Sequence, residues 1–233
     1  MTHKKIVFVI VEGPTDDESL GVMLERIFES YTVHVEIMHC DITTEHDPSG
    51  TKVISTVQKT IRGYAARYHY TLKDFDRVIH IIDTDGAFVP EENVVEDAGI
   101  KKVRYEKDRI VARNRAAIVQ RNERKSANLG KLSGCPVILS GIPYSVYYMS
   151  CNLDHVLHDR QNSSNDDKTR NALRIARRYK DDAEGFVRFI SGSDFSVTGD
   201  YGASWRFIAE GTNSLRRHTN LGIALVSGEA AEG

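Results

Sequence analysis

The sequence predicts an α/β fold in which a parallel sheet of about four strands is sandwiched by helices, with a basic helical insertion and a helical C-terminal extension. Two observations support this. Short apolar runs rich in Val and Ile, at residues 6–11 and 78–82, are typical of strands that are covered on both faces. Residues 53–68 between them carry apolar side chains at helical spacing, so strands and helices alternate.

In the first half of the chain we expect strand, helix, strand, helix and strand. Their expected ranges are 6–11, 15–28, 32–38, 53–68 and 77–83. Gly13 and Pro14 break the first strand, and Thr15 can cap the helix that follows. Asp16 then lies in the first turn of that helix, where the helix dipole favours negative charge.

In the second half, residues 101–131 are rich in Lys and Arg and contain enough apolar residues for a helix, and residues 128–134 are expected to form a loop. A fourth buried strand is expected at 136–140. Helices are expected from Leu153 onward and at 169–179, 183–190 and 204–218. We therefore divide the chain into a domain at 1–160, with a basic helical insertion at about 93–134, and a helical extension at 161–233.

Composition indicates a cytoplasmic protein. The 233 residues include three widely spaced cysteines, and the sequence begins with no recognisable targeting pattern. The longest apolar run, residues 6–11, is far too short to span a membrane. The formal net charge of −2 hides the local excess of positive charge at residues 101–131.

Three carboxylates follow predicted strands. Glu12 comes directly after the first strand, and Asp83 and Asp85 end the third, where Gly86 lets the chain turn. The carboxyl ends of parallel strands meet at one edge of the sheet, which is where ligands bind in open α/β sheets. Carboxylates held close together need a neutralising cation, and Mg²⁺ typically takes one or two of them. The alternative is an acid-rich turn exposed to solvent.

The basic segment allows two interpretations. It can be an ordinary solvated face, or it can follow a nucleic-acid backbone, since cations provide affinity for phosphates that does not depend on base sequence. The candidate nucleic-acid-binding residues are Lys101, Lys102, Arg104, Arg109, Arg113, Arg115 and Arg121.

The motifs Val9-Ile10-Val11-Glu12-Gly13-Pro14-Thr15-Asp16 and Ile81-Ile82-Asp83-Thr84-Asp85-Gly86 resemble those of the Toprim superfamily, which pairs a Glu after the first strand with a D-x-D after the third. The resemblance covers roughly residues 4–157 and is closest to the small OLD-like and abortive-infection nucleases of phage defence. It implies that Glu12, Asp83 and Asp85 are catalytic and bind Mg²⁺ or Mn²⁺, and that Asp16 and Asp154 are further metal ligands.

The same resemblance implies a metal-dependent nuclease that cleaves phosphodiester bonds in DNA or RNA, tRNA included, as an effector of antiphage defence. Nucleic acid is then the expected partner. A separate ATPase subunit is a further candidate partner, because the sequence contains no G-x-x-x-x-G-K-[ST] loop of its own. A second copy of the chain is another candidate.

Two other functions stay open. Residues 81–88 also resemble the first motif of haloacid-dehalogenase phosphatases, with Leu139-Ser140-Gly141 as the second, which would make Asp83 a nucleophile. Alternatively, the chain is a non-catalytic interaction module whose basic helix contacts a partner.

Overall fold

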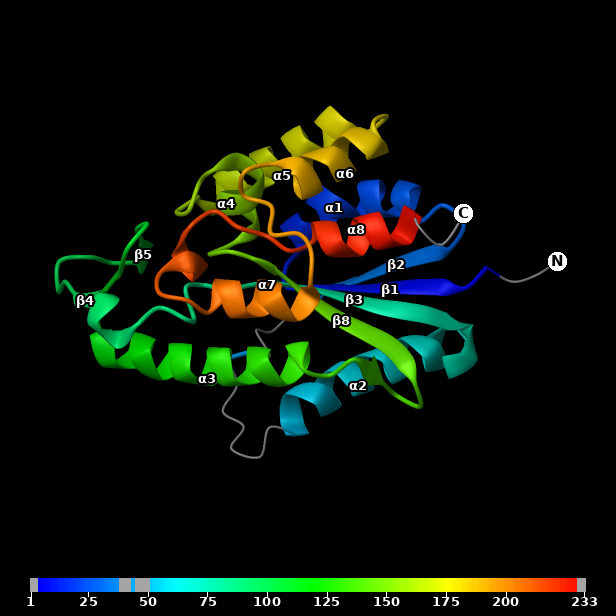
Figure 1. Cartoon of the computed structure of the whole chain (residues 1–233), viewed down its shortest axis with the longest axis horizontal. Helices are drawn as coiled ribbons and strands as arrows, with labels where there is room; N and C mark the ends of the chain where they lie inside the picture. Colours follow the sequence, from blue (N-terminus) through cyan, green and yellow to red (C-terminus); the bar gives the residue numbers. More distant parts are fainter. Residues whose placement is uncertain (1–3, 38–42, 45–50, 230–233) are drawn as a thin grey trace.

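The computed structural model describes residues 4–37, 43–44 and 51–229, and its centre is a five-stranded sheet of order β2-β1-β3-β8-β7 (Figure 1). The strands are β1 (Ile6–Val11), β2 (Thr32–Ile37), β3 (Phe75–Asp83), β7 (Val137–Ile138) and β8 (Ile142–Met149). β1 pairs in parallel with β2 and β3, β3 pairs in parallel with β8, and β7 runs antiparallel to β8. The predicted α/β fold with a mainly parallel sheet is confirmed.

Helices cover both faces of this sheet. All six residues of β1 are buried; Ile6, Phe8 and Ile10 face one core, and the three valines between them face the other. The first core includes α2 (Thr51–Arg67), α3 (Arg115–Ser133) and α7 (Tyr201–Ile208). The second includes α1 (Pro14–Ile27), α4 (Leu153–His158), α5 (Asn165–Tyr179), α6 (Ala183–Gly192) and α8 (Gly222–Glu229). The C-terminal helices therefore share their cores with the sheet.

The fourth parallel strand is β8, so the prediction of a strand at 136–140 is wrong. Leu139, Ser140 and Gly141 have φ angles of 39°, 51° and 102°, so the chain turns where the strand was expected to continue. Only Val137 and Ile138 extend, antiparallel to β8. Pro143 lies near the start of β8, where proline is tolerated.

The insertion between β3 and β8 is helical only from Arg115 onward. Before α3 it forms a three-stranded sheet of order β4-β6-β5, made of β4 (Val94–Glu96), β5 (Arg104–Tyr105) and β6 (Ile110–Ala112). Strands this short carry no periodic pattern that a sequence could reveal. Residues 128–133, expected to be a loop, are the last turns of α3, and Asn128 and Leu129 are buried.

The helix expected at 204–218 ends early. Gly211 adopts a φ of 52°, and the chain continues as a short 3₁₀ helix at Asn213–Leu215. The segment that follows is hydrogen-bonded to the end of β8, because the Ser150 N–H donates to the His218 carbonyl at 2.9 Å and the Tyr148 N–H to Asn220 Oδ1 at 2.8 Å. Within the described residues, none of the helices combines the length and apolar character needed to cross a bilayer.

Candidate active site

The candidate site lies at the carboxyl edge of the sheet, where β1, β3 and β8 end side by side. β1 leads into Glu12, β3 ends at Asp83 opposite Met149 of β8, and β8 leads into α4 with Asp154 in its first turn. Parallel pairing of the three strands therefore brings together acids that are up to 142 positions apart in the sequence (12 to 154).

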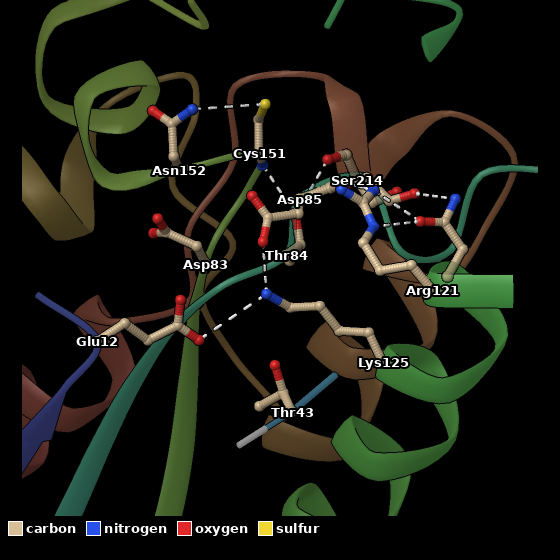
Figure 2. Close-up of polar contacts among 12 residues, drawn as sticks. Glu12, Thr43, Asp83, Thr84, Asp85, Arg121, Lys125, Cys151, Asn152 and Ser214 are labelled. Atoms are coloured by element: carbon tan, nitrogen blue, oxygen red, sulfur yellow. Dashed lines mark hydrogen bonds and ion pairs between the residues drawn. The ribbon is translucent and has the colours of Figure 1, made fainter. Parts of the chain in front are cut away.

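Asp85 is held by a sharp turn and by a buried lysine. Its φ is 48° and that of Gly86 is 66°, a conformation that glycine adopts readily. A Cβ at Gly86 would lie 2.7 Å from Leu215 Cδ2, so the close packing there also requires glycine. Asp85 Oδ2 accepts a hydrogen bond of 2.6 Å from Lys125 Nζ, which also lies 3.9 Å from Glu12 Oε1 (Figure 2). The Lys125 side chain is completely buried.

Lys125 belongs to a polar face of α3 that the sequence did not reveal. Arg121, Asn122, Lys125 and Asn128 recur at helical spacing on the side that meets the sheet edge. Arg121 Nη2 donates to the Asp85 carbonyl at 2.7 Å, Asn122 Nδ2 to the Gly86 carbonyl at 3.4 Å, and Asn128 Nδ2 to the Thr43 carbonyl at 2.9 Å. Two of these contacts fix the helix against the loop that carries Asp85, and the third fixes it against the segment at Thr43.

Asp83 lies beside these groups in a more negative environment (Figure 2). Its Oδ1 accepts a hydrogen bond of 3.0 Å from the Leu153 N–H. Burial, followed by the charges of Glu12, Asp16 and Asp85, raises the pKa of Asp83 well above its usual value. Placing a negative charge on this carboxylate is therefore costly unless a cation binds it.

Asp16 and Asp154 complete the acidic edge. Asp16 Oδ2 accepts a hydrogen bond from the Gly13 N–H at 2.9 Å, and burial raises its pKa to about 6. Asp154 is buried and accepts a hydrogen bond of 3.2 Å from Asn171 Nδ2. With Asp83 and Lys168 they border a cavity of about 10 Å³, roughly the space that one water molecule needs.

Asp85 titrates in the opposite direction to Asp83. Burial acts to raise its pKa, but the positive charges of Lys125 and Arg121 outweigh burial and lower the pKa below 3.8. Asp85 therefore stays ionised, as one half of an ion pair.

A pocket of about 540 Å³ opens in front of Asp83 and Asp85. Four cations line it together with these two acids: Lys101, Lys102, Arg104 and Lys168. Tyr105, Asn152, Gln161 and Asn162 add hydrogen-bonding groups to its wall. The pocket thus presents two carboxylates beside a set of positive charges.

Two loops meet across this pocket. The Tyr105 N–H donates to Asn162 Oδ1 at 2.9 Å, and Asn162 Nδ2 donates to the Tyr105 carbonyl at 2.8 Å. Asn152 Nδ2 donates to the Gln161 carbonyl at 2.8 Å and so ties the second loop to the start of α4. The basic insertion is therefore attached to the body of the protein at the site.

The predicted basic residues divide into two groups. Lys101, Lys102 and Arg104 line the pocket, and Arg121 holds the Asp85 loop. The others lie outside the pocket wall: Arg113 is exposed, Arg109 pairs with Asp108 and Glu106, and Arg115 pairs with Glu91 and donates to the Val94 carbonyl. Local acids engage Arg109 and Arg115, as Glu106 engages Arg104, and the predicted nucleic-acid-binding role of Arg109, Arg113 and Arg115 stays a prediction.

The donor set has the chemistry that Mg²⁺ prefers, since all five predicted ligands are hard carboxylate oxygens and Mg²⁺ needs only one or two of them beside water and phosphate. Across residues 4–37, 43–44 and 51–229, however, no three His, Cys, Asp or Glu side chains are grouped closely enough to hold a metal on their own. Glu12 and Asp85 instead have the Lys125 ammonium between them (Figure 2). The carboxylates that suit an ion best are thus those around Asp83.

Sequence reasoning missed Lys125, Lys168 and Asn152. Lys125 was visible only as one more charge in a basic segment, and a spacing of i, i+1, i+4 and i+7 with Arg121, Asn122 and Asn128 was the available clue. Comparison with known proteins adds nothing further: no protein-family model, curated protein or solved structure matches the chain.

Proposed function

We propose that this protein is a Mg²⁺-dependent nuclease that cleaves phosphodiester bonds in DNA or RNA. One observation carries the proposal: the pocket at the carboxyl edge of the sheet places Asp83 and Asp85 beside Lys101, Lys102, Arg104 and Lys168. A carboxylate such as Asp83 binds a divalent ion, and the surrounding cations bind phosphates. A phosphodiester substrate would use both.

The roles of the acids follow from their surroundings. Asp83, with Asp16 and Asp154 behind it, would hold the ion, because these carboxylates are crowded and Asp83 lines the pocket. The chemistry that such an ion supplies is activation of the attacking oxygen and stabilisation of the leaving oxygen. Glu12, the neighbour of Asp83, would accept or donate the proton of the reaction.

The cations of the insertion would position the substrate. Lys101, Lys102 and Arg104 are exposed and lie on one wall of the pocket, and Lys168 lies near Asp16 and Asp83. Contacts of this kind fix the register of a nucleic-acid backbone without reading its bases. We therefore expect broad sequence tolerance and strong salt dependence.

The Toprim resemblance extends the proposal to a biological role. It suggests an effector of antiphage defence that works with a separate ATPase. This part of the proposal rests on the two sequence motifs alone.

The test is to incubate the purified chain with plasmid DNA, total RNA and tRNA in Mg²⁺ or Mn²⁺, beside Asp83→Ala. We expect cleavage by the wild type and none by the variant. Asp76→Ala is the matched control, because Asp76 lies on the same strand far from the site and pairs with Arg77 at the surface. Cleavage that persists in Asp83→Ala would remove the proposal.

The position of Leu139-Ser140-Gly141, the second motif of the phosphatase alternative, argues against that alternative. Ser140 lies in the turn before β8, at the amino edge of the sheet, whereas Asp83 lies at the carboxyl edge. The interaction-module alternative is distinguished by melting curves, since an ion that binds only the folded state raises its melting temperature and a module without a metal site shows no such rise.

A further inference from the structure

The lysine among the acids is unusual in its burial and its contacts. Lys125 has no exposed side-chain surface, and its Nζ lies 2.6 Å from Asp85 Oδ2 and 3.9 Å from Glu12 Oε1. A lysine is almost never buried to this extent unless it is paired. Its ammonium group takes the position between two carboxylates that a metal ion takes in a cation site (Figure 2).

The backbone of α3 holds this lysine in place. One turn before it, Arg121 donates to the Asp85 carbonyl, and almost one turn after it, Asn128 donates to the Thr43 carbonyl. The helix therefore cannot slide without breaking contacts on both sides of Lys125. Retraction of the ammonium would also leave a buried charge without compensation.

Lys125 does not line the pocket, so it does not meet the substrate there. It acts through the carboxylates that it contacts, as a positioning residue. Asp85 is the only one of them that lines the pocket described above. The positive charge of Lys125 therefore acts on the pocket through Asp85.

We propose that Lys125 is a built-in cation that occupies one of two cation places at this edge, between Glu12 and Asp85, and leaves the chain a single exchangeable divalent ion. The inference rests on the proposed function for the identity of that ion. Enzymes that act on phosphodiesters often use two metal ions about 3.5–4 Å apart. In this protein one of the two positive centres is a side chain.

The exchangeable ion would bind Asp83. This carboxylate lines the pocket and borders the small cavity shared with Asp16 and Asp154. Its hydrogen bond comes from a neutral donor, the Leu153 N–H, whereas Asp85 has the ammonium. Asp83 and Asp85, which are separated by one residue, therefore bind different cations: Asp83 the divalent ion and Asp85 the Lys125 ammonium.

The test counts Mn²⁺ ions bound to the full chain by equilibrium dialysis and electron paramagnetic resonance. We expect one ion per wild-type chain and two per Lys125→Met chain, because methionine keeps an unbranched side chain up to Cε but lacks the ammonium that lies between Glu12 and Asp85. Arg124→Met is the control: it removes a charge from the same helix outside the polar face of Arg121, Asn122, Lys125 and Asn128, and should keep the count at one.

Two ions per wild-type chain, or equal counts in wild type and Lys125→Met, would overturn the inference. If Lys125→Met does not fold, the wild-type count alone decides between one ion and two. A purely structural role is separated by melting curves, since Mn²⁺ should raise the melting temperature of Lys125→Met more than that of the wild type only if the ion takes the place of the ammonium.

Ion counts and cleavage assays together distinguish failure of this inference from failure of the proposed nuclease function. A count that rises from one to two without cleavage of any nucleic acid would remove the nuclease and keep the role of Lys125. Cleavage by a wild-type chain that binds two ions would keep the nuclease and remove the role of Lys125.

Discussion

The two sides of the acidic edge shift the pKa of an aspartate in opposite directions. Toward α3, Asp85 meets Lys125 and Arg121, and these charges outweigh burial and lower its pKa. Toward α1 and α4, Asp83 is buried among other acids and its pKa is raised. Neighbouring carboxylates whose surroundings shift their pKa values in opposite directions commonly have different roles. Asp85 is thus neutralised by the protein itself, and under the proposed function Asp83 is the carboxylate that binds a ligand.

The largest expected effect is that of Asp83→Asn on cleavage. We expect activity to fall about 1,000-fold, or about 4 kcal/mol in transition-state stabilisation at 1.36 kcal/mol per decade. In chelator, the same variant should gain about 1 kcal/mol in unfolding free energy, because a neutral amide relieves repulsion while its oxygen can still accept from Leu153. Cleavage rates and urea unfolding with EDTA measure the two effects. A loss of stability would contradict the comparison.

Asp85→Asn should have the opposite effect on stability. It leaves the buried Lys125 ammonium with a neutral neighbour, and breaking a buried ion pair typically costs 3–5 kcal/mol. We expect a loss of about 3 kcal/mol in urea unfolding with EDTA, since Glu12 at 3.9 Å still compensates part of the charge. Asp85→Asn combined with Lys125→Met should recover much of this loss, because the buried ammonium that lost the Asp85 carboxylate is then removed as well. Equal changes at Asp83 and Asp85 would show that the two sides do not differ.

The pH dependence of stability should follow the acids with raised pKa. The pKa of Asp16 is about 6 in the folded chain and near 3.8 when unfolded, so the folded state binds the extra proton between these values. Unfolding free energy should therefore fall as pH rises from 4 to 6, by about 1–2 kcal/mol once partial exposure is allowed for.

The measurement is urea unfolding at several pH values in EDTA, with Asp16→Asn as the comparison. Between pH 4 and pH 6, the unfolding free energy of Asp16→Asn should fall less than that of the wild type, because asparagine does not titrate. Identical slopes in the two proteins would mean that Asp16 is not a titrating group of this region.

The smallest expected effect concerns the pocket rim. Replacing Lys101 and Lys102 with alanine should weaken nucleic-acid binding several-fold and reduce the salt slope of the binding constant by about 1 for each lost phosphate contact. Fluorescence anisotropy with Ca²⁺ in place of Mg²⁺ measures binding without cleavage. Arg109→Ala is the control from the same insertion, because Arg109 pairs with Asp108 outside the pocket wall. Equal effects of both changes would place the substrate elsewhere.

Much of the sheet could be predicted from the sequence, because buried parallel strands leave continuous apolar runs such as residues 6–11. The acids could be found for the same reason: Glu12 and Asp83 interrupt such runs at the ends of the strands. β8 was missed because its aromatic sequence begins with Ile142 and Pro143, and proline usually ends a strand.

Lys125 could not be found in this way. Within a helix whose residues are mostly polar, the spacing of Lys125 with Arg121, Asn122 and Asn128 does not show that this face is buried until the loops that it contacts are placed. Its partners Glu12 and Asp85 lie far away in sequence, and the pairing appears only in three dimensions. Buried polar side chains are thus the part of the site that the pattern of apolar residues in the sequence predicts least well.

The hydrogen bonds between β8 and residues 213–220 have a consequence for biosynthesis. The Cys151 N–H donates to the Ser214 carbonyl and to Thr84 Oγ1, and Thr84 Oγ1 donates to the Ser214 carbonyl, so this late segment holds the backbone on which Asp83 and Asp85 sit. During translation these contacts cannot form before Ser214 has left the ribosome. A growing chain therefore lacks these contacts behind Asp83 and Asp85 until residue 214 has emerged, although all of the acids have been made by then.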